Sequence, residues 1–373
     1  MKATNIPFLC PEISDEALDA CLSSIRSGWL AFGSYTAKAE TLLAEFFSAE
    51  NFLITSSCTA SLQLALMLEN IGPGDEVITT PLTWVATSNV ILYQGATVKF
   101  ADVDPKTGLI SIEDVVSKIT PRTKAVITVD LYGAMLDYKK LRQAIGNDVV
   151  IVEDAAHAIG SKYNNSNPGS LVDYCCFSFH AAKNITSGQG GGLICKDPEK
   201  ANLAKLLRRD GVSGRDGARA MYALGHKFDA TDFQSAMLID QVKTYPLRHA
   251  KRKAVYETYE RLFQDFKNLR FQHRHSMNEH SGHMFVLWLD DHTLRAPLLQ
   301  FYHENGISAS VHYNPVHLEP YYRERFSFKE GSYPIAEKIG AGAVSLPTYP
   351  GLEPNSQQYI ANITAQFFAE KRK

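Results

Sequence analysis

The sequence predicts an α/β protein whose larger N-terminal domain is built on a mostly parallel sheet, with a smaller α+β domain at the C-terminal end. Through the first two-thirds of the 373 residues, short apolar runs alternate with helical patterns, which is typical of βαβ units. Near residue 230 the pattern changes to a long, charged helix. We therefore expect two domains, residues 1–247 and 248–373. Hydrophobic residues make up 45% and charged residues 21%, ordinary values for a chain that buries a core.

The expected elements follow from the spacing of the apolar residues. Helices are expected over 36–47, 59–69, 84–94 and 138–145, and strands over 76–80, 97–102, 124–131, 149–154, 174–179 and 191–195. In the second domain we expect one long or broken helix over 232–264, strands over 283–289 and 307–313, and a helix over 294–304.

Composition and charge exclude several classes of protein. The net charge is −2 and no long Lys or Arg run occurs, so no nucleic-acid partner is expected. No apolar run reaches the length of about 18 residues that a membrane span needs, and the N-terminus does not resemble a signal peptide. The six cysteines form no spaced framework, which favours reduced, buried thiols and a cytoplasmic location. His273, His275, His280 and His283 match no zinc spacing, so we expect no metal there and an exposed loop that leads into a strand.

Two polar segments lie where ligands of α/β sheets gather, at strand ends and helix starts. Cys58 and Thr59 open a predicted helix beside other small residues. Their backbone N–H groups predict an anion site, although a simple helix cap explains the same residues. Asp154 ends a predicted buried strand. A buried carboxylate needs a cationic or donor partner, which a protonated pyridine nitrogen, a helix start or an ion pair would supply.

A third segment carries a lysine just beyond a predicted buried strand. Partial desolvation there would lower the pKa of Lys183 and make its amine a nucleophile, whereas an ordinary loop lysine is solvated. Gly188 and the glycines at 190–192 let the backbone pass close to a bulky group. Because these glycines precede a strand rather than a helix, a dinucleotide-binding fingerprint is excluded.

Taken together, these segments resemble the sugar aminotransferases of the DegT/DnrJ/EryC1/StrS family, which are fold-type I (aspartate aminotransferase-like) enzymes that use pyridoxal 5′-phosphate (PLP). The similarity runs over nearly the whole chain, from Ser27-Gly28-Trp29-Leu30 to Ser345-Leu346-Pro347. Its most specific part is Ser178-Phe179-His180 followed by Lys183. Within the family, the chain is most similar to the transaminases that make UDP-4-amino-sugars.

The resemblance implies a role for each candidate residue. It implies that PLP is the cofactor, that Lys183 forms a Schiff base with it and acts as acid and base, and that Asp154 pairs with the pyridinium nitrogen. The other implied contacts to PLP are phosphate binding by Cys58, Thr59 and Ser178, stacking of Trp84 on the ring, and His157 beside it. A buried structural role is the alternative for Trp84.

The resemblance also implies an assembly and a reaction. Lys227 would reach the phosphate of the partner subunit, giving a homodimer with shared active sites. His312 and His317 would border the substrate pocket, unless they are structural. Three positions depart from the family pattern: Gln189, Asp210 and Asp229. The last of these bears on the contact with the partner subunit.

The implied reaction transfers an amino group from glutamate to a nucleotide-linked 4-keto-6-deoxy sugar, carried on UDP or dTDP. Two alternatives remain open: an aminotransferase of this fold that acts on a non-sugar ketone, and a non-catalytic homologue. The 3-dehydratases of the family carry His in place of the lysine, so Lys183 argues against that activity.

Overall fold

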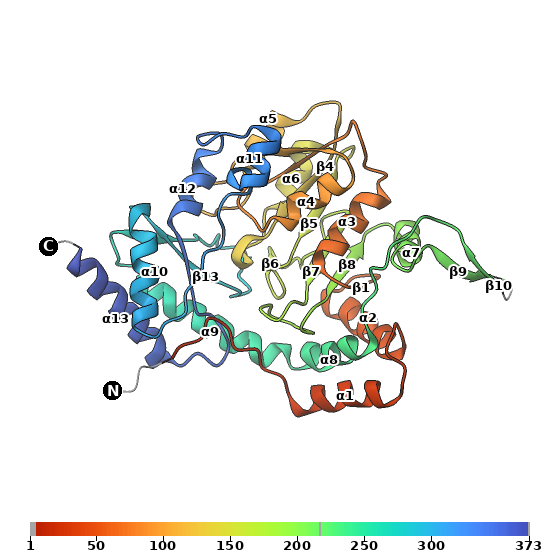
Figure 1. The fold of residues 1–373 in the computed structure, drawn as a ribbon, viewed down its shortest axis with the longest axis horizontal. Coiled ribbons are helices and arrows are strands. Elements are labelled where there is room, and N and C mark those ends of the chain that lie inside the picture. The colour runs from red at the N-terminus through yellow and green to blue at the C-terminus, as the bar shows by residue number, and fades with distance from the viewer. Residues whose placement is uncertain (1–4, 216–217, 372–373) are drawn as a thin grey trace.

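A seven-stranded mixed sheet forms the centre of the molecule (Figure 1). In the computed structural model, which describes residues 5–215 and 218–371, the strand order is β1-β8-β7-β5-β4-β2-β3. β2, β3, β4, β5 and β7 are mutually parallel, and β8 runs antiparallel to both of its neighbours. The predicted mostly parallel sheet is therefore confirmed. The strands are β1 (Leu53–Thr55), β2 (Glu76–Thr79), β3 (Thr97–Phe100), β4 (Thr123–Val129), β5 (Val150–Asp154), β7 (Tyr174–Ser178) and β8 (Gly191–Cys195).

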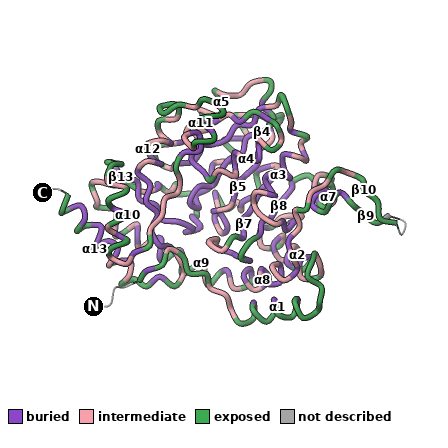
Figure 2. The backbone as a smooth tube through the Cα atoms, in the orientation of Figure 1, coloured by how far each residue is buried: buried purple, intermediate pink, exposed green. Residues whose placement is uncertain are grey.

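Helices cover both faces of this sheet because successive side chains of each strand point to opposite sides. In β5, Ile151 packs into one apolar cluster and Val152 into another. The second cluster contains residues of α3 (Cys58–Leu68), α4 (Ala86–Tyr93) and α7 (Pro198–Leu207). The first contains residues of α2 (Ser34–Phe47), α5 (Ile112–Lys118), α6 (Tyr138–Ile145) and α8 (Asp232–Lys243). The central strands are buried, whereas α1 (Asp15–Arg26) presents an exposed side at the edge of the molecule (Figure 2).

The C-terminal part has a core of its own. An antiparallel sheet of β11 (Leu269–Phe271), β13 (Phe285–Leu289) and β14 (Ala343–Leu346) packs with α9 (Tyr245–Phe263), α10 (Arg295–Glu304) and α13 (Pro354–Glu370). Ile6 from the N-terminal end joins this core, and its N–H donates to Gly306 O at 2.8 Å. The smaller elements are β6 (Lys162–Tyr163), β9 (Val212–Arg215), β10 (Ala218–Met221), β12 (Asn278–Glu279), α11 (Pro320–Phe326), α12 (Pro334–Gly342) and the 3₁₀ turns Leu131–Gly133, His292–Leu294 and Val316–Leu318.

The long or broken helix expected over 232–264 is confirmed in its broken form, as α8 and α9, which meet at Thr244. Pro246 lies in the first turn of α9, where its missing N–H costs nothing, whereas inside a continuous helix it would break the hydrogen-bond ladder. The strand expected over 307–313 is wrong. Ile307 bridges Ile6 and Ser310 bridges Ser345, so the segment meets two different partners at single residues and forms no ladder.

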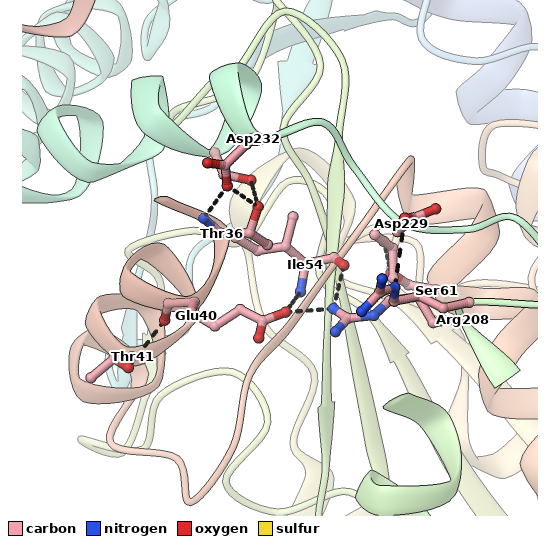
Figure 3. Close-up of polar contacts among 12 residues, drawn as sticks. Thr36, Glu40, Thr41, Ile54, Ser61, Arg208, Asp229 and Asp232 are labelled. Atoms are coloured by element: carbon pink, nitrogen blue, oxygen red, sulfur yellow. Dashed lines mark hydrogen bonds and ion pairs between the residues drawn. The ribbon is translucent and has the colours of Figure 1, made fainter. Parts of the chain in front are cut away.

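Buried polar contacts join α2 and the end of α7 to strand β1, and join α8 to α2 (Figure 3). Arg208 is 2% exposed and donates through Nη1 to the Glu40 carboxylate and to Ile54 O, the latter at 2.6 Å. Glu40 also accepts from Ile54 N at 2.8 Å. Nearby, Asp232 at the start of α8 accepts from both the N–H and the hydroxyl of Thr36. Removing one partner of such a buried charged pair costs about 3–5 kcal/mol, so the network fixes α2 and α8 against the sheet.

No helix within residues 5–215 and 218–371 is long and apolar enough to cross a membrane. All six cysteines are free. Four of them are buried, as expected, but Cys58 is half-buried and Cys10 is exposed.

Candidate active site

A cavity of about 530 Å³ opens where the carboxyl ends of β5 and β7 face the C-terminal part of the chain. Ligands of open α/β sheets bind at such strand ends. Of the ten candidate residues expected from the sequence, eight line this cavity: Cys58, Thr59, Trp84, Asp154, His157, Ser178, Lys183 and His312. Lys227 and His317 are not among its lining residues.

The N-terminus of α3 forms one wall of the cavity. Ser57 caps the helix by accepting from Ala60 N at 3.1 Å, so the first backbone N–H groups, those of Cys58 and Thr59, have no acceptor within the helix. These donors and the helix dipole favour an anion. A Cβ on Gly191 would lie 2.2 Å from the carbonyl carbon of Ser57, so this close approach of β8 requires glycine. With the Ser178 hydroxyl at the end of β7, the wall fits a phosphate group.

The Asp154 carboxylate lies at the end of β5 and is held by local donors. Thr87 donates to Oδ2 at 2.9 Å and Ala156 N to Oδ1 at 3.1 Å, while the Cys58 thiol lies 3.7 Å away. Burial raises the pKa of Asp154 above its usual range. No cation forms an ion pair with this carboxylate in the described part of the chain within 4.0 Å, so the site suits a ligand with a positively charged N–H. Thr87 was not among the expected residues.

Lys183 lies in the loop after β7, in a turn where its N–H donates to His180 O at 2.9 Å. Burial lowers the pKa of Lys183 to about 8, while Asp154 and Cys58 act in the opposite direction. A pKa near 8 leaves a useful fraction of the amine neutral near physiological pH, which is the form that attacks a carbonyl carbon.

Two histidines, His157 and His283, lie beside Lys183 with their rings in contact, the centroids 4.5 Å apart and the planes tilted by 31°. Burial lowers the pKa of both rings well below the usual range, so both are neutral. Tyr132 N donates to His157 Nδ1 at 3.2 Å. The ring proton of His157 is therefore on Nε2, which lies 3.1 Å from the Tyr313 hydroxyl and donates to it.

The sequence did not identify His283 as a candidate, and the exposed loop expected around it is only half right. His273 and His275 are exposed, but His280 and His283 are buried. His283 Nδ1 lies 3.0 Å from Asn184 Oδ1, the acceptor end of that amide, so Nδ1 carries the proton. Its Nε2 is buried and has no partner among the described residues. An acceptor nitrogen next to Lys183 thus remains open for a ligand group.

The mouth of the cavity is formed by segments from distant parts of the sequence. His312 Nδ1 lies 2.8 Å from Ser345 Oγ, and its ring stacks on Phe8 with centroids 5.6 Å apart. Trp84 is 62% exposed, which excludes the buried structural role considered above. Its ring lies 6.1 Å from that of Tyr313, so an aromatic face is available to a flat ligand at the mouth.

The two remaining candidates lie elsewhere. Lys227 is exposed and pairs with Asp229 at 3.2 Å and with Asp210 at 3.7 Å. His317 is fully buried, where Nε2 lies 2.9 Å from Glu337 Oε1 and the ring packs against Tyr333. In this structure His317 therefore fills a core position rather than the cavity wall.

The cavity combines three kinds of group that together fit PLP. The N-terminus of α3 and Ser178 suit its phosphate, Asp154 suits its pyridinium nitrogen, and the Lys183 amine suits its aldehyde. When bound, PLP supplies an electron sink for bonds made and broken at an amino-bearing carbon. A fold of this kind with such a cavity fits a PLP-dependent enzyme.

Comparison with known proteins names the family. The sequence matches the DegT/DnrJ/EryC1/StrS aminotransferase family over residues 11–364, and the chain belongs to this family. Its members depend on PLP, which confirms the expected cofactor. Spore coat polysaccharide biosynthesis protein SpsC of Bacillus subtilis is 34% identical over 361 residues, covering 93% of each chain.

Solved structures agree with this assignment. Spr1654 from Streptococcus pneumoniae, known in PLP and pyridoxamine-phosphate forms, superimposes in the latter with a TM-score of 0.93 at 28% identity, over 99% of this chain and 100% of that one. Helicobacter pylori PseC, an aminotransferase of pseudoaminic acid biosynthesis, gives a TM-score of 0.93 at 28% identity, over 98% and 100%. The expected fold-type I architecture is confirmed.

Proposed function

We propose that this protein transfers an amino group from glutamate to a nucleotide-linked 4-keto-6-deoxy sugar, with UDP or dTDP as the carrier. The observation that carries the proposal is the meeting of Lys183, Asp154 and the N-terminus of α3 in one cavity. A sugar aminotransferase and an aminotransferase of pseudoaminic acid biosynthesis among the structural neighbours, and a polysaccharide biosynthesis protein among the relatives, support the sugar as acceptor.

Each side chain has a distinct task in this proposal. Lys183 would hold the cofactor through its amine, and the same amine would take up and return the proton at the substrate carbon. Asp154 keeps the ring nitrogen protonated. Cys58, Thr59 and Ser178 bind the phosphate, Trp84 covers the ring face, and His157 lies beside the ring. His312 contacts the substrate at the cavity mouth; His317, also expected there, would act only through the packing behind it.

A homodimer with shared active sites forms part of the proposal. Leu18, Leu22 and Ile25 are spaced so that they share one side of α1, and they are 48%, 44% and 48% exposed. Trp29 and Leu30, which follow α1 in the chain, are also exposed, at 63% and 48%. An exposed apolar surface of this kind marks a protein interface, and a second copy would cover it in a two-fold dimer.

Subunit mixing tests whether Lys227 completes the partner's site. Lys183→Arg and Lys227→Glu chains are each expected to be nearly inactive at limiting PLP. If they are unfolded and refolded together, half of the dimers carry one chain of each kind, and one of their two sites contains neither substitution. Activity should then return to about a quarter of the wild-type value. If the mixture stays at the level of the separately refolded variants, each site is formed within one chain.

The pKa of Lys183 sets the pH at which PLP attaches. Only the neutral amine reacts, so the rate at which the PLP-free protein takes up PLP should rise with pH and reach half its maximum near pH 8. An ordinary lysine would show this midpoint near about 10.4. The growth of PLP absorbance after mixing, followed at a series of pH values, gives the profile. A midpoint near that of a solvated lysine would contradict the assignment.

A substrate panel tests the reaction itself. Glutamate is offered with UDP-, dTDP- and GDP-linked 4-keto-6-deoxy sugars, and the products are identified by mass spectrometry and NMR. We expect amination of a UDP- or dTDP-linked sugar with formation of 2-oxoglutarate. Turnover of a non-sugar ketone in the absence of any sugar product would favour the alternative substrate class.

A further inference from the structure

Two fully buried carboxyl groups, Asp130 and Glu153, lie on neighbouring strands next to the cavity. Glu153 belongs to β5 and is paired with Thr128 of β4, while Asp130 directly follows β4. Asp130 N donates to Asp154 O at 3.1 Å. The pair therefore lies immediately beside the residue proposed to hold the cofactor nitrogen.

Each carboxyl has one oxygen satisfied by the protein and one that is not. Asp130 Oδ1 accepts from the Tyr138 hydroxyl at 2.7 Å and from Leu136 N at 3.1 Å. Glu153 Oε2 accepts from Gly169 N at 2.8 Å. Asp130 Oδ2 and Glu153 Oε1 are both buried and receive no donor from the described residues. Glu153 is paired with Thr128, two residues before Asp130, so the two carboxyls lie on the same face of the sheet and act on each other. Two neighbouring carboxyls without other donors to these oxygens require a proton between them.

The charged groups around the pair also favour a proton between the two carboxyls. Among the described residues, the titratable groups with the largest effects on the pair are Tyr138 of α6, Cys175 of β7 and Asp154 of β5, and none of these three is a cation. Two ionised carboxylates in such a dry setting repel each other, so one keeps its proton. Burial raises the pKa of both carboxyls above the usual range, so the pair holds one proton at neutral pH.

We propose that Asp130 and Glu153 share one proton between Oδ2 and Oε1, and that this proton positions Asp154 and His157 in the cavity. The connection is short: Asp130 N bonds Asp154 O, and two residues later Tyr132 N bonds His157 Nδ1. Asp130 and Glu153 are positioning residues, since neither lines the cavity. The positioning half of the inference rests on the proposed role of Asp154.

The test replaces the shared proton with an amide. In Glu153→Gln, the amide N–H₂ donates to Asp130 Oδ2 and the amide oxygen still accepts from Gly169 N. Asp130→Asn is the reciprocal change, with its N–H₂ donating to Glu153. Each single variant should fold and bind PLP within about threefold of wild type. In the double variant both amide oxygens still accept the bonds from Tyr138, Leu136 and Gly169, so the two N–H₂ groups face each other without an acceptor. Its PLP affinity should therefore fall by more than about tenfold.

The full-length protein loaded with PLP gives two direct readouts of the proton. The infrared band of a buried protonated carboxyl should be present in wild type and absent from both single variants. Above about pH 4.3 the unfolded wild-type chain has released a proton that the folded protein still holds. Its folding equilibrium constant should therefore fall by up to tenfold per pH unit, relative to that of Glu153→Gln, until the pH passes the pKa of the folded state. Denaturant titrations between about pH 6 and pH 9 measure this difference.

The outcomes separate the parts of the inference. Equal pH slopes for wild type and Glu153→Gln, or an unchanged infrared band, overturn the shared proton. A double variant that binds PLP as well as the single variants overturns the positioning role. None of these measurements uses a keto-sugar, so failure of the substrate panel with these results intact would count against the proposed function alone.

Discussion

Replacing Lys183 with arginine is expected to reduce transamination by about 10⁴-fold, the upper range for loss of a positioned acid–base group. Arginine stays cationic at any working pH, so it can neither attach PLP nor accept the substrate proton. The purified variant should also lack the near-visible absorbance of covalently held PLP, and borohydride should fix no cofactor to it. Absorbance and steady-state assays on the same preparation measure both effects.

Lys139→Arg is the matched control, because Lys139 is an exposed lysine on α6 and its replacement should change neither activity nor absorbance. The Lys183→Arg protein should still bind PLP reversibly, since the N-terminus of α3, Ser178 and Asp154 are untouched. Turnover by Lys183→Arg at the wild-type rate would show that another group carries the chemistry.

Replacing Asp154 with asparagine should lower kcat by about 10³-fold, the scale of losing a preorganised electrostatic contact. The amide oxygen can still accept from Thr87, but the neutral side chain no longer stabilises a protonated ring nitrogen. PLP attachment should persist, because Lys183 is intact. Rapid mixing with glutamate, followed by the change in cofactor absorbance, isolates the half-reaction in which the loss is expected.

A cofactor analogue separates charge from structure in the Asp154→Asn variant. PLP methylated on its ring nitrogen carries a permanent positive charge and does not need a carboxylate to keep it. It should recover a substantial part of the lost rate in the variant and none in the wild type. If the analogue gives no recovery while the variant remains folded, the loss comes from distorted geometry, and the pairing of Asp154 with the ring nitrogen would be refuted.

The sequence predicted the residues whose position depends on local structure. Asp154 and Ser178 end apolar runs that became the parallel strands β5 and β7. Parallel strands bring their carboxyl ends to one edge of a sheet, so their meeting could be predicted without knowing the packing of helices. Lys183 follows one of these strands by five residues and was carried to the same edge.

The residues that the sequence did not reveal reach the cavity through tertiary contacts. Thr87 bonds Asp154 across 67 residues and Tyr313 contacts His157 across 156. His283 lay in a run of histidines that looked like a surface loop, and only the packing of the loop onto Gly133 and His157 buries it. No local spacing distinguishes such residues from ordinary core or loop positions.

Residues 307–317 are a second case in which tertiary contacts, rather than local spacing, decide the structure. Alternation of apolar and polar residues predicted a strand, but pairing requires a free neighbouring strand edge, which is a property of the whole fold. Of the two histidines expected here at the substrate pocket, His312 lines the cavity and His317 turns inward to Glu337. A displacement of five residues along the chain was enough to separate the two environments.

The two sides of the cavity are synthesised at different times, because their residues lie far apart in the sequence. The N-terminus of α3, Asp154, Ser178 and Lys183 have all been translated once synthesis reaches Gly190. The opposite wall includes His283, His312 and Thr348, which come later. At typical translation speeds the roughly 160 intervening residues take about 8–30 s. Throughout that interval Lys183 lacks the wall that completes its burial, so its amine would remain closer to that of an ordinary, protonated lysine. Loading of the cofactor into a closed site is thus an event that follows synthesis.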